Sequence, residues 1–512
     1  MQSGHTSQCK HLFMDRKADS NVGVIGGGIG GLVAAVHLAH AGYHVELFEQ
    51  CDRVGGKCNV NVFDGCTFET GPTLVTMPFV LDDVFEHVGR RREDYINLRP
   101  VDPACQYRWS DGSKLDMPFA LEDVINAIDA FSPGEGKGAR QYLEHAREVY
   151  ELTKDIFIFS PFDGLREFMK LKNVSMLPKL PRLRFASSLH RHNSSYFRDP
   201  RLRQLFDRFA TYNGSNPYKA PATLMVIPWV EIGFGAWYPE GGMYAIVDGL
   251  ARLAAELGVV IHTNSRVTSI DISHKRVRGL QIATGQNYTC HHVVSNADVY
   301  VTQKHLLGMS VPEPSDLSCS GFVMQVCVEK KELGLAHHNI LFADKYEQEF
   351  RAIERGMHQD PQSTIYISRS VVADASLAAE GSENWFILVN APANGVSSTL
   401  NGSEQSAWQG QHEKLADQTF KRLATFGLHP TVRSYNIRTP DTMATEWSSF
   451  RGALYGASSN SPLSAFLRPR QKSRDVGNLW YVGGSAHPGG GIPLVATSGM
   501  IAARLIEESS SI

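Results

Sequence analysis

Residues 21–50 of the chain read NVGVIGGGIGGLVAAVHLAHAGYHVELFEQ. The apolar run before the glycines predicts a strand over 22–25, and the stretch Ile29–Ala41, closed by Gly42, predicts a helix. Residues 44–48 predict a second strand that ends at Glu49. A strand, a GxGxxG turn, a helix and an acidic residue about 20 positions on are together typical of a βαβ unit that binds a dinucleotide.

The glycines and the acid of this unit have separate predicted tasks. Gly26 permits the tight turn, Gly28 lets the backbone approach a pyrophosphate, and Gly31 lets the helix pack against the strand. The helix N-terminus offers N–H groups and a partial positive charge to phosphate. Glu49 can accept hydrogen bonds from a ribose 2′-hydroxyl and would repel a 2′-phosphate, so NADP is disfavoured. A plain glycine-rich turn explains the combination less well.

The residues after Glu49 extend the predicted nucleotide site. Arg53 or Lys57 can neutralise the pyrophosphate, although a basic surface turn is the alternative for this stretch. The rigid turn at Gly71 and Pro72 can approach the ring of the cofactor. The predicted site also includes Gln50 and Gly56.

A second glycine-rich stretch lies near the other end of the chain, over 483–491. It follows a predicted buried strand at 479–482 and precedes a predicted helix over 500–506, for which Thr497 or Ser498 is the expected cap. The spacing is not that of an independent dinucleotide motif, and no other GxGxxG occurs, so we expect one dinucleotide. Two glycine clusters near opposite ends indicate a domain assembled from the first and last segments.

The region between these ends predicts a second domain. A hairpin is expected over 105–117, mostly helices from 121 to 239, and strands at 321–328, 364–368 and 385–389. The predicted nucleotide-binding domain comprises 20–95, 238–300 and 475–512, and the predicted substrate domain comprises 96–237 and 301–474.

Composition excludes several classes of protein. The chain has 50 Lys and Arg against 53 Asp and Glu among 512 residues, a formal net charge of −3. This balance argues against a nucleic-acid binder that works by gross charge. Eight cysteines without a CxxC pair favour free thiols in a reducing compartment, and we expect no metal site. The first 20 residues lack the apolar run of a signal peptide, and no stretch is long and apolar enough to span a membrane.

The glycine stretches together resemble the bacterial phytoene desaturase branch of the amine-oxidase and phytoene-desaturase superfamily. The motifs that carry the resemblance are Gly26-x-Gly28-x-x-Gly31 with Glu49, TYNGSNP at 211–217, YPEGGMY at 238–244, SCSGF at 318–322, HHN at 337–339 and GGSAHPGGGIP at 483–493. The resemblance implies an α/β fold with a Rossmann-like FAD-binding domain of discontinuous segments and an inserted α+β substrate domain. It also implies FAD as cofactor and covers about residues 20 to 508.

The resemblance assigns further residues to the cofactor. It places the Val267 backbone at the adenine end, and it places the second glycine stretch along the pyrophosphate and flavin, through Gly484, Gly491, Ile492, Pro493 and Leu494. The acid that amine oxidases carry near Gly484 is absent, which disfavours amine oxidation.

The resemblance leaves several reactions open. The first is desaturation of a linear carotenoid of the phytoene, diapophytoene or hydroxycarotenoid type, by hydride transfer to flavin. The second is terminal-methyl oxygenation of diapocarotenoids on the same fold. A non-catalytic flavin-containing carotenoid carrier and a squalene-type dehydroxylase are further alternatives. Chain length, electron acceptor and oligomeric state cannot be read from the sequence.

A carotenoid must be held by apolar burial, so aromatic residues are candidates for substrate contact. Ordinary core packing is the alternative for each of them. Glu231 and His487 are the candidate proton-transfer residues, and His487 also fits a structural role in its glycine loop. The candidate substrate residues are Trp229, Phe234, Trp237, Tyr238 and Phe322.

Residues 161–192 combine basic and apolar side chains. This composition is typical of an interfacial membrane contact, and a solvated basic face is the alternative. We therefore expect a cytoplasmic protein that associates peripherally with a membrane surface, where a lipid-soluble substrate would enter.

Overall fold

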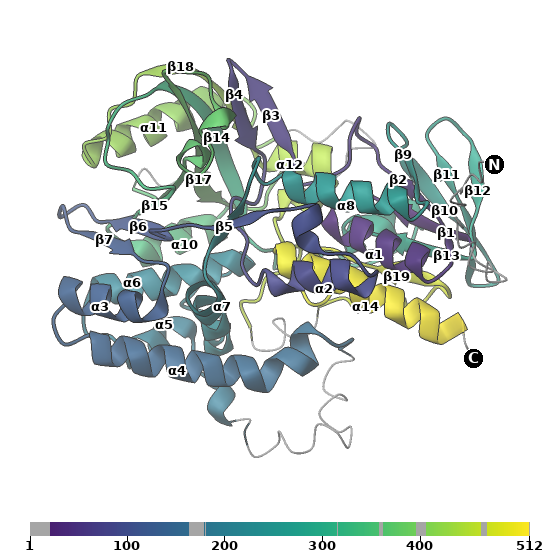
Figure 1. The fold of residues 1–512 in the computed structure, drawn as a ribbon, viewed down its shortest axis with the longest axis horizontal. Helices are drawn as coiled ribbons and strands as arrows, with labels where there is room; N and C mark the ends of the chain where they lie inside the picture. The colour runs from purple at the N-terminus through teal and green to yellow at the C-terminus, as the bar shows by residue number, and fades with distance from the viewer. Residues whose placement is uncertain are drawn as a thin grey trace, which may run out of the picture.

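The computed structural model describes residues 21–162, 179, 181–314, 316–357, 362–395, 406–461 and 468–510. Figure 1 shows a parallel sheet with its helices on one side of the molecule, and a mixed sheet above a layer of helices on the other. No helix in these ranges is both long and apolar enough to cross a bilayer.

The parallel sheet has the strand order β19-β13-β1-β2-β9, with every neighbouring pair parallel. Its strands are β1 (Asn21–Ile25), β2 (His44–Phe48), β9 (Val260–His262), β13 (His292–Ser295) and β19 (Leu479–Tyr481). Segments far apart in the chain thus form one sheet around β1. This confirms the predicted Rossmann-like α/β fold built from discontinuous segments.

Three helices pack beside this sheet: α1 (Ile29–His40), α8 (Ala245–Glu256) and α14 (Ile492–Ser510) (Figure 1). Helix α1 is buried over its whole length from Ile29 to Leu38. It reaches α14 at small residues, since a Cβ on Gly499 would lie 2.6 Å from the Gly30 carbonyl oxygen. The first and last segments of the chain therefore touch through their backbones.

The mixed sheet has the order β18-β14-β17-β16-β15-β6-β7. The strands are β6 (Cys105–Arg108), β7 (Lys114–Met117), β14 (Ser320–Glu329), β15 (His338–Leu341), β16 (Ile365–Ser368), β17 (Ser382–Ala391) and β18 (Val432–Arg438). One face packs against α11 (His412–Thr425) around Phe322, Trp385 and Leu415. The other face is turned toward the nucleotide-binding half and the helical layer.

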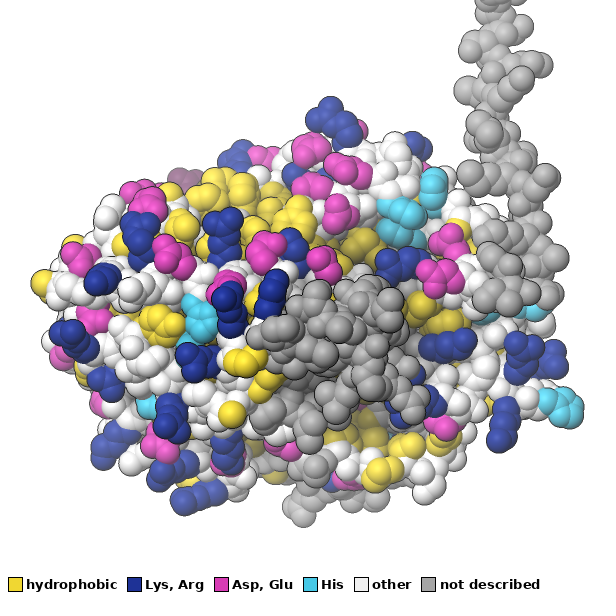
Figure 2. Space-filling model, turned by 90° about the horizontal axis from the view of Figure 1, so that it is seen from below, with side chains coloured by type: hydrophobic (Ala, Val, Ile, Leu, Met, Phe, Trp, Pro, Cys, Tyr) yellow, Lys and Arg dark blue, Asp and Glu magenta, His cyan; other side chains and the backbone are white. Residues whose placement is uncertain are grey.

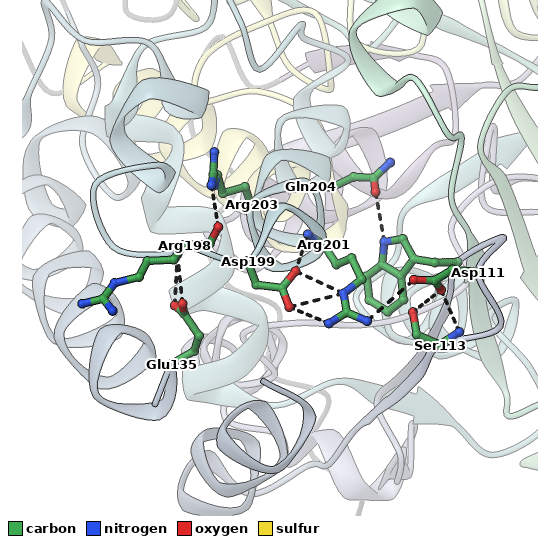
Figure 3. Close-up of polar contacts among 9 residues, drawn as sticks. Asp111, Ser113, Glu135, Arg198, Asp199, Arg201, Arg203 and Gln204 are labelled. Carbon is green, nitrogen blue, oxygen red and sulfur yellow. Dashed lines mark hydrogen bonds and ion pairs between the residues drawn. The ribbon is translucent and has the colours of Figure 1, made fainter. Parts of the chain in front are cut away.

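The helical layer contains α3 (Leu121–Phe131), α4 (Gly136–Thr153), α5 (Leu189–Asn193), α6 (Pro200–Asp207) and α7 (Val226–Phe234). Polar contacts fasten it to the β6–β7 hairpin (Figure 3). Asp199 caps α6 by accepting from the Arg201 backbone N–H at 2.8 Å, and Gln204 accepts from Trp109 Nε1 at 3.0 Å. The mostly helical character expected for 121–239 is confirmed for the described residues of that range, which leave out 163–178 and 180.

Smaller elements complete the fold. They are β3 (Val60–Phe63) with β4 (Cys66–Glu69), β5 (Leu98–Pro100) with β8 (Trp237–Pro239), the sheet β10 (Val267–Ser273), β11 (Arg276–Ile282) and β12 (Asn287–Thr289), and the helices α2 (Phe79–His87), α9 (Val299–Val301), α10 (Tyr346–Glu354) and α12 (Pro440–Trp447).

The prediction for the start of the last helix is wrong. Helix α14 begins at Ile492, directly after Gly491, and not at residue 500. Thr497 and Ser498 lie inside it, where Thr497 Oγ1 donates to the Pro493 carbonyl at 2.9 Å and Ser498 Oγ donates to the His487 carbonyl at 2.8 Å. The glycine loop therefore runs straight into a helix N-terminus, the same arrangement as at α1.

Candidate functional site

A cavity of about 560 Å³ lies where the two glycine stretches meet. It is bordered by the first turn of α1, the end of β2, the loops after β2 and β4, and the loop before α14. The predicted cofactor residues that line it are Gly26, Gly28, Glu49, Gln50, Arg53, Gly56, Lys57, Gly71, Pro72, Val267, Gly484, Gly491 and Ile492. Gly31, Pro493 and Leu494 are outside this lining.

The first glycine turn is shaped by close backbone contacts. Gly26 has φ +91°, and its N–H donates to the Phe48 carbonyl at 2.8 Å. A Cβ on Gly31 would lie 2.2 Å from the Gly26 carbonyl oxygen, so Gly31 acts by packing helix on strand, without facing the cavity. Gly28 is the N-cap residue of α1 and leaves the first N–H groups of the helix facing the cavity.

Asn296, which the sequence analysis did not single out, joins the two glycine stretches. Its Nδ2 donates to the Gly26 carbonyl at 3.3 Å. A Cβ on Gly28, Gly30 or Gly483 would lie 2.8, 2.9 or 2.5 Å from the Asn296 amide. The residue follows β13 directly, and the position after a strand parallel to β1 is the signal that could have found it.

Glu49 is fixed at the end of β2. One carboxylate oxygen accepts from the Gly27 N–H at 2.8 Å and the other from the Cys51 N–H at 2.9 Å. The side chain is buried at the cavity wall, opposite Val267 at the start of β10. A carboxylate has room for further donors, so both oxygens can take ribose hydroxyls.

The two cations after β2 differ in their surroundings. Lys57 Nζ donates to the Leu454 carbonyl at 2.6 Å, and burial lowers the pKa of Lys57 to about 8, opposed by the nearby Asp298. The Arg53 side chain is half exposed and lies 3.6 Å from Asp52. Arg53 is therefore the cation that can move toward a phosphate, while Lys57 is anchored in the wall.

The second glycine stretch closes the cavity from the other side. Gly491 has φ +100° and immediately precedes α14. A Cβ on Gly490 would lie 2.0 Å from Tyr455 Cδ1, so the Tyr455 ring packs directly on the backbone of the loop. Two helix N-termini, those of α1 and α14, thus face one cavity, which suits a diphosphate and a polar ring edge.

The residues present fit FAD. The cavity combines a fixed carboxylate for ribose, two helix N-termini and a glycine backbone that approaches closely. It also has a recess lined mostly by apolar residues of the mixed sheet and α12, with Arg438 and Glu446 beside them. Val323 and Leu388 come from neighbouring strands of the mixed sheet, with Phe386 beside them, and Met443 and Trp447 come from α12.

The predicted substrate residues do not line this cavity. Tyr238 and Phe322 are 1% exposed, and Trp229 is buried against Phe234. Trp237 donates its ring N–H to the Phe234 carbonyl at 2.8 Å. Phe322 is outside the lining because neighbours on a strand face opposite ways: Phe322 packs under α11 while Val323 faces the cavity.

Neither predicted proton-transfer residue lies in the cavity lining. Glu231 is buried and accepts from Arg208 Nη2 at 3.0 Å and from the Tyr212 hydroxyl. His487 Nε2 pairs with the Ser160 carbonyl at 3.0 Å, and burial lowers the pKa of His487 to about 4. Glu231 is thus committed to a buried ion pair, and His487 to holding its loop.

The fold and the cavity define an α/β oxidoreductase that binds a flavin dinucleotide. The chain belongs to the family described as flavin containing amine oxidoreductase, which matches residues 29–320, and FAD dependent oxidoreductase matches residues 190–505. It is therefore an FAD-dependent oxidoreductase.

Curated relatives match over almost the full length. The chain is 34% identical to the 1-hydroxycarotenoid 3,4-desaturase of Flavobacterium sp. (strain P99-3), over 95% of this chain and 99% of that protein. It is 31% identical to the zeta-carotene-forming phytoene desaturase of Myxococcus xanthus, over 95% and 92%. It is 30% identical to the 4,4'-diapolycopene oxygenase of Methylomonas sp, over 95% and 98%. The predicted resemblance is confirmed.

Solved structures agree in fold. An oxidoreductase from Methanosarcina mazei matches with a TM-score of 0.62 at 17% identity, over 95% of this chain and 100% of that chain. Putrescine oxidase bound to putrescine matches with a TM-score of 0.59 at 16% identity, over 96% and 99%.

Proposed function

We propose that this protein is an FAD-dependent carotenoid desaturase, which introduces a double bond into a linear carotenoid of the phytoene, diapophytoene or hydroxycarotenoid type. The observation that carries the proposal is one continuous cavity in which a nucleotide cradle meets an apolar recess. The relatives named as desaturases of hydroxycarotenoid and phytoene support the choice of substrate class.

The chain's own residues would bind and orient FAD and the carotenoid. Glu49 would hold the ribose, and the N-termini of α1 and α14 would face the diphosphate and the polar edge of the ring. FAD, when bound, supplies the hydride acceptor. The recess around Val323, Phe386 and Met443 would exclude water and gain about 25 cal/mol for each Å² of apolar surface buried.

Product mass tests the reaction. Expression in hosts that make phytoene, diapophytoene or a 1-hydroxycarotenoid is expected, in at least one of them, to yield carotenoids that have lost pairs of hydrogens, each pair lowering the mass by about 2 Da. A host with the empty vector is the control. Unchanged pigment from a protein purified with bound FAD would contradict the proposal.

Terminal oxygenation is the second candidate, because the chain is 30% identical to the diapolycopene oxygenase and only slightly more, 31%, to two of the phytoene desaturases. The same pigment extracts separate the two reactions. Oxygen atoms gained in the product would favour oxygenation, whereas loss of hydrogens without gain of oxygen would favour desaturation.

We further propose a peripheral membrane contact through residues 161–192. Residues 163–178 and 180 lie outside the described residues. On the face shown in Figure 2, Lys and Arg side chains lie among apolar and acidic ones. Lys179, Arg184 and Arg191 are exposed, whereas Leu183 is fully buried and belongs to the core.

Vesicle co-sedimentation tests this contact. Neutralising Lys170, Lys172 and Arg182 together is expected to reduce binding to anionic vesicles by roughly tenfold or more, at about 1 kcal/mol per cation near the surface. Unchanged binding would contradict the proposal. Neutralising Lys114, Lys275 and Arg276, on the β7 and β10–β11 hairpins, is the matched control.

A further inference from the structure

One buried arginine lacks the partner that the other buried arginines of the described residues have. Five arginine side chains are buried there, and four of them lie close to a carboxylate. The four pairs are Arg208 with Glu231 at 3.0 Å, Arg369 with Glu383 at 2.7 Å, Arg422 with Asp344 at 3.5 Å, and Arg438 with Glu446. The fifth, Arg468, forms no ion pair within the described residues. A buried charge without a partner is costly, so a negative group from outside the chain is expected to balance it.

Among the described residues, Arg468 donates only to neutral acceptors. Its Nη1 donates to the carbonyl of Tyr455 at 2.9 Å and to the carbonyl of Gly484 at 3.1 Å, and its Nη2 donates to Asn213 Oδ1 at 2.7 Å. Burial lowers the pKa of Arg468 to about 10, and Tyr455 nearby opposes this shift. The three hydrogen bonds fix the position of the guanidinium group, but they leave its positive charge without a counter-charge.

The two carbonyls that Arg468 holds belong to peptide groups at the cavity. In a planar trans peptide the N–H points opposite to the C=O. The N–H groups of Gly456 and Ser485 therefore point away from Arg468. Gly456 and Ser485 line the cavity, and neither N–H has a hydrogen-bond acceptor among the described residues. Arg468 is outside the lining, so it acts from behind these two peptide groups and leaves both donors available to a ligand.

These peptide groups lie beside the N-terminus of α1. A Cβ on Gly30, in the first turn of α1, would lie 3.2 Å from the Gly483 backbone nitrogen. A Cβ on Gly456 would lie 2.9 Å from Ser485 Cβ, so the Gly456 and Ser485 peptide groups are neighbours. The N-terminus of the helix that follows GxGxxG is where a dinucleotide-binding fold holds the diphosphate. The two free N–H groups therefore belong to the diphosphate part of the cradle.

We propose that Arg468 is a positioning residue for the diphosphate of FAD. Its hydrogen bonds aim the Gly456 and Ser485 N–H groups at the phosphate oxygens, and the negative charge of the diphosphate balances the charge of its guanidinium group. The attraction acts across one peptide layer inside the protein, where electrostatic interactions are stronger than in water. This role depends on FAD as the cofactor and not on which carotenoid reaction follows.

The test compares three variants of the purified protein, each with and without FAD. Arg468→Gln keeps an N–H donor and removes the charge, and Arg468→Lys keeps the charge. Arg422→Gln is the matched control, because Arg422 is also buried and donates to a backbone carbonyl, that of Phe342, at 2.8 Å and outside the cavity lining. The measurements are the dissociation constant of FAD, the melting temperature of the apoprotein, and the ³¹P resonances and visible absorption of bound FAD.

We expect Arg468→Gln to weaken FAD binding by about 30-fold or more, as removal of one partner of a buried charge pair does. Arg468→Lys should weaken it by less than about fivefold, and Arg422→Gln should leave it unchanged. In Arg468→Lys the ³¹P resonances should move while the visible absorption of the flavin stays in place. The apoprotein of Arg468→Gln should melt no lower than that of Arg422→Gln, because only the second variant removes a charge that has a partner.

Four results would overturn this role. They are FAD binding by Arg468→Gln within about threefold of the wild type, an equal loss of affinity in Arg468→Lys and Arg468→Gln, an Arg468→Gln apoprotein that melts below that of Arg422→Gln, and a moved flavin absorption with unmoved ³¹P resonances. The last result would place the charge at the ring. Unchanged pigment in the expression hosts, together with the expected FAD binding, would contradict the proposed function alone.

Discussion

Gly31 shows how little space single residues leave around the nucleotide cradle. Its added Cβ would lie 2.2 Å from the Gly26 carbonyl oxygen, a backbone atom that cannot swing aside. We expect Gly31→Ala to destabilise the protein by about 1–3 kcal/mol and to abolish FAD binding. Urea unfolding and flavin fluorescence check this. Gly321→Ala is the control, because its nearest atom is 3.4 Å away, and equal losses in both variants would contradict the explanation.

Glu49 is the second single residue whose side chain should decide how tightly FAD binds. Its two oxygens accept from the backbone N–H groups of Gly27 and Cys51. In Glu49→Gln one of these acceptors becomes an NH₂ donor, which cannot accept from the N–H group or from a ribose hydroxyl. We expect FAD affinity to fall about 10- to 100-fold, the cost of about 1.5–3 kcal/mol for a lost hydrogen bond to a charged group. Fluorescence titration of apoprotein with FAD measures this, and unchanged affinity would remove Glu49 from the site.

At the scale of elements, the loop before α14 is held by His487. Its carbonyl accepts from Gln471 Nε2 at 2.6 Å and from Ser498 Oγ at 2.8 Å, and its ring contacts the Ser160 carbonyl. Burial lowers the pKa of His487 from 6.5 to about 4. The folded protein therefore keeps this ring neutral over a pH range in which the unfolded chain protonates it.

This pKa shift predicts a pH dependence. Because the unfolded chain binds the extra proton, stability is full above pH 6.5 and falls as pH drops from 6.5 toward about 4, by up to about 1.4 kcal/mol per pH unit. His37 and His337, with pKa values lowered to about 3, act in the same direction. The raised pKa values of Asp207 and Asp298 oppose it.

The variant His487→Asn isolates the contribution of this one group. Urea unfolding at pH 7, 6 and 5 should give a shallower loss of stability with falling pH than in the wild type. The comparison is between slopes, so a constant offset from lost packing does not matter. Equal slopes in both proteins would show that His487 is not held neutral.

At the scale of the whole molecule, the cavity draws its walls from both ends of the chain and from the mixed sheet. FAD should therefore bind only the folded state and stabilise it by mass action. At a free FAD concentration of 100 times the dissociation constant, we expect the free energy of unfolding to rise by about 2.7 kcal/mol. Unfolding of apoprotein with and without FAD measures this gain, with AMP as a control ligand, and no gain would mean that the cavity is not the FAD site.

The sequence predicted the local parts of this site well. The strands, turn and helix at 21–48 were expected within a residue or two of their observed bounds. These elements are set by runs of apolar residues and by glycines, which act over short distances. Asn296 was missed because its partners, Gly26 and Gly483, are remote in the chain.

The wall that the mixed sheet gives to the cavity could not be predicted in the same way. Whether Phe322 or Val323 faces the cavity depends on which face of β14 α11 covers, and that is a property of packing between distant elements. The same is true of Glu231. The sequence alone makes it a candidate for proton transfer, because the sequence does not show that Arg208 and Tyr212 lie beside it.

The sequence by itself determined the βαβ nucleotide motif, because apolar periodicity and glycine spacing are local and explicit, and its motifs carried the resemblance to the family. Only the tertiary structure decided which side chains share the cavity and which, like Glu231 and His487, are paired outside its lining. Those groupings follow from strand register and helix packing, which join residues hundreds of positions apart and leave no local mark in the chain.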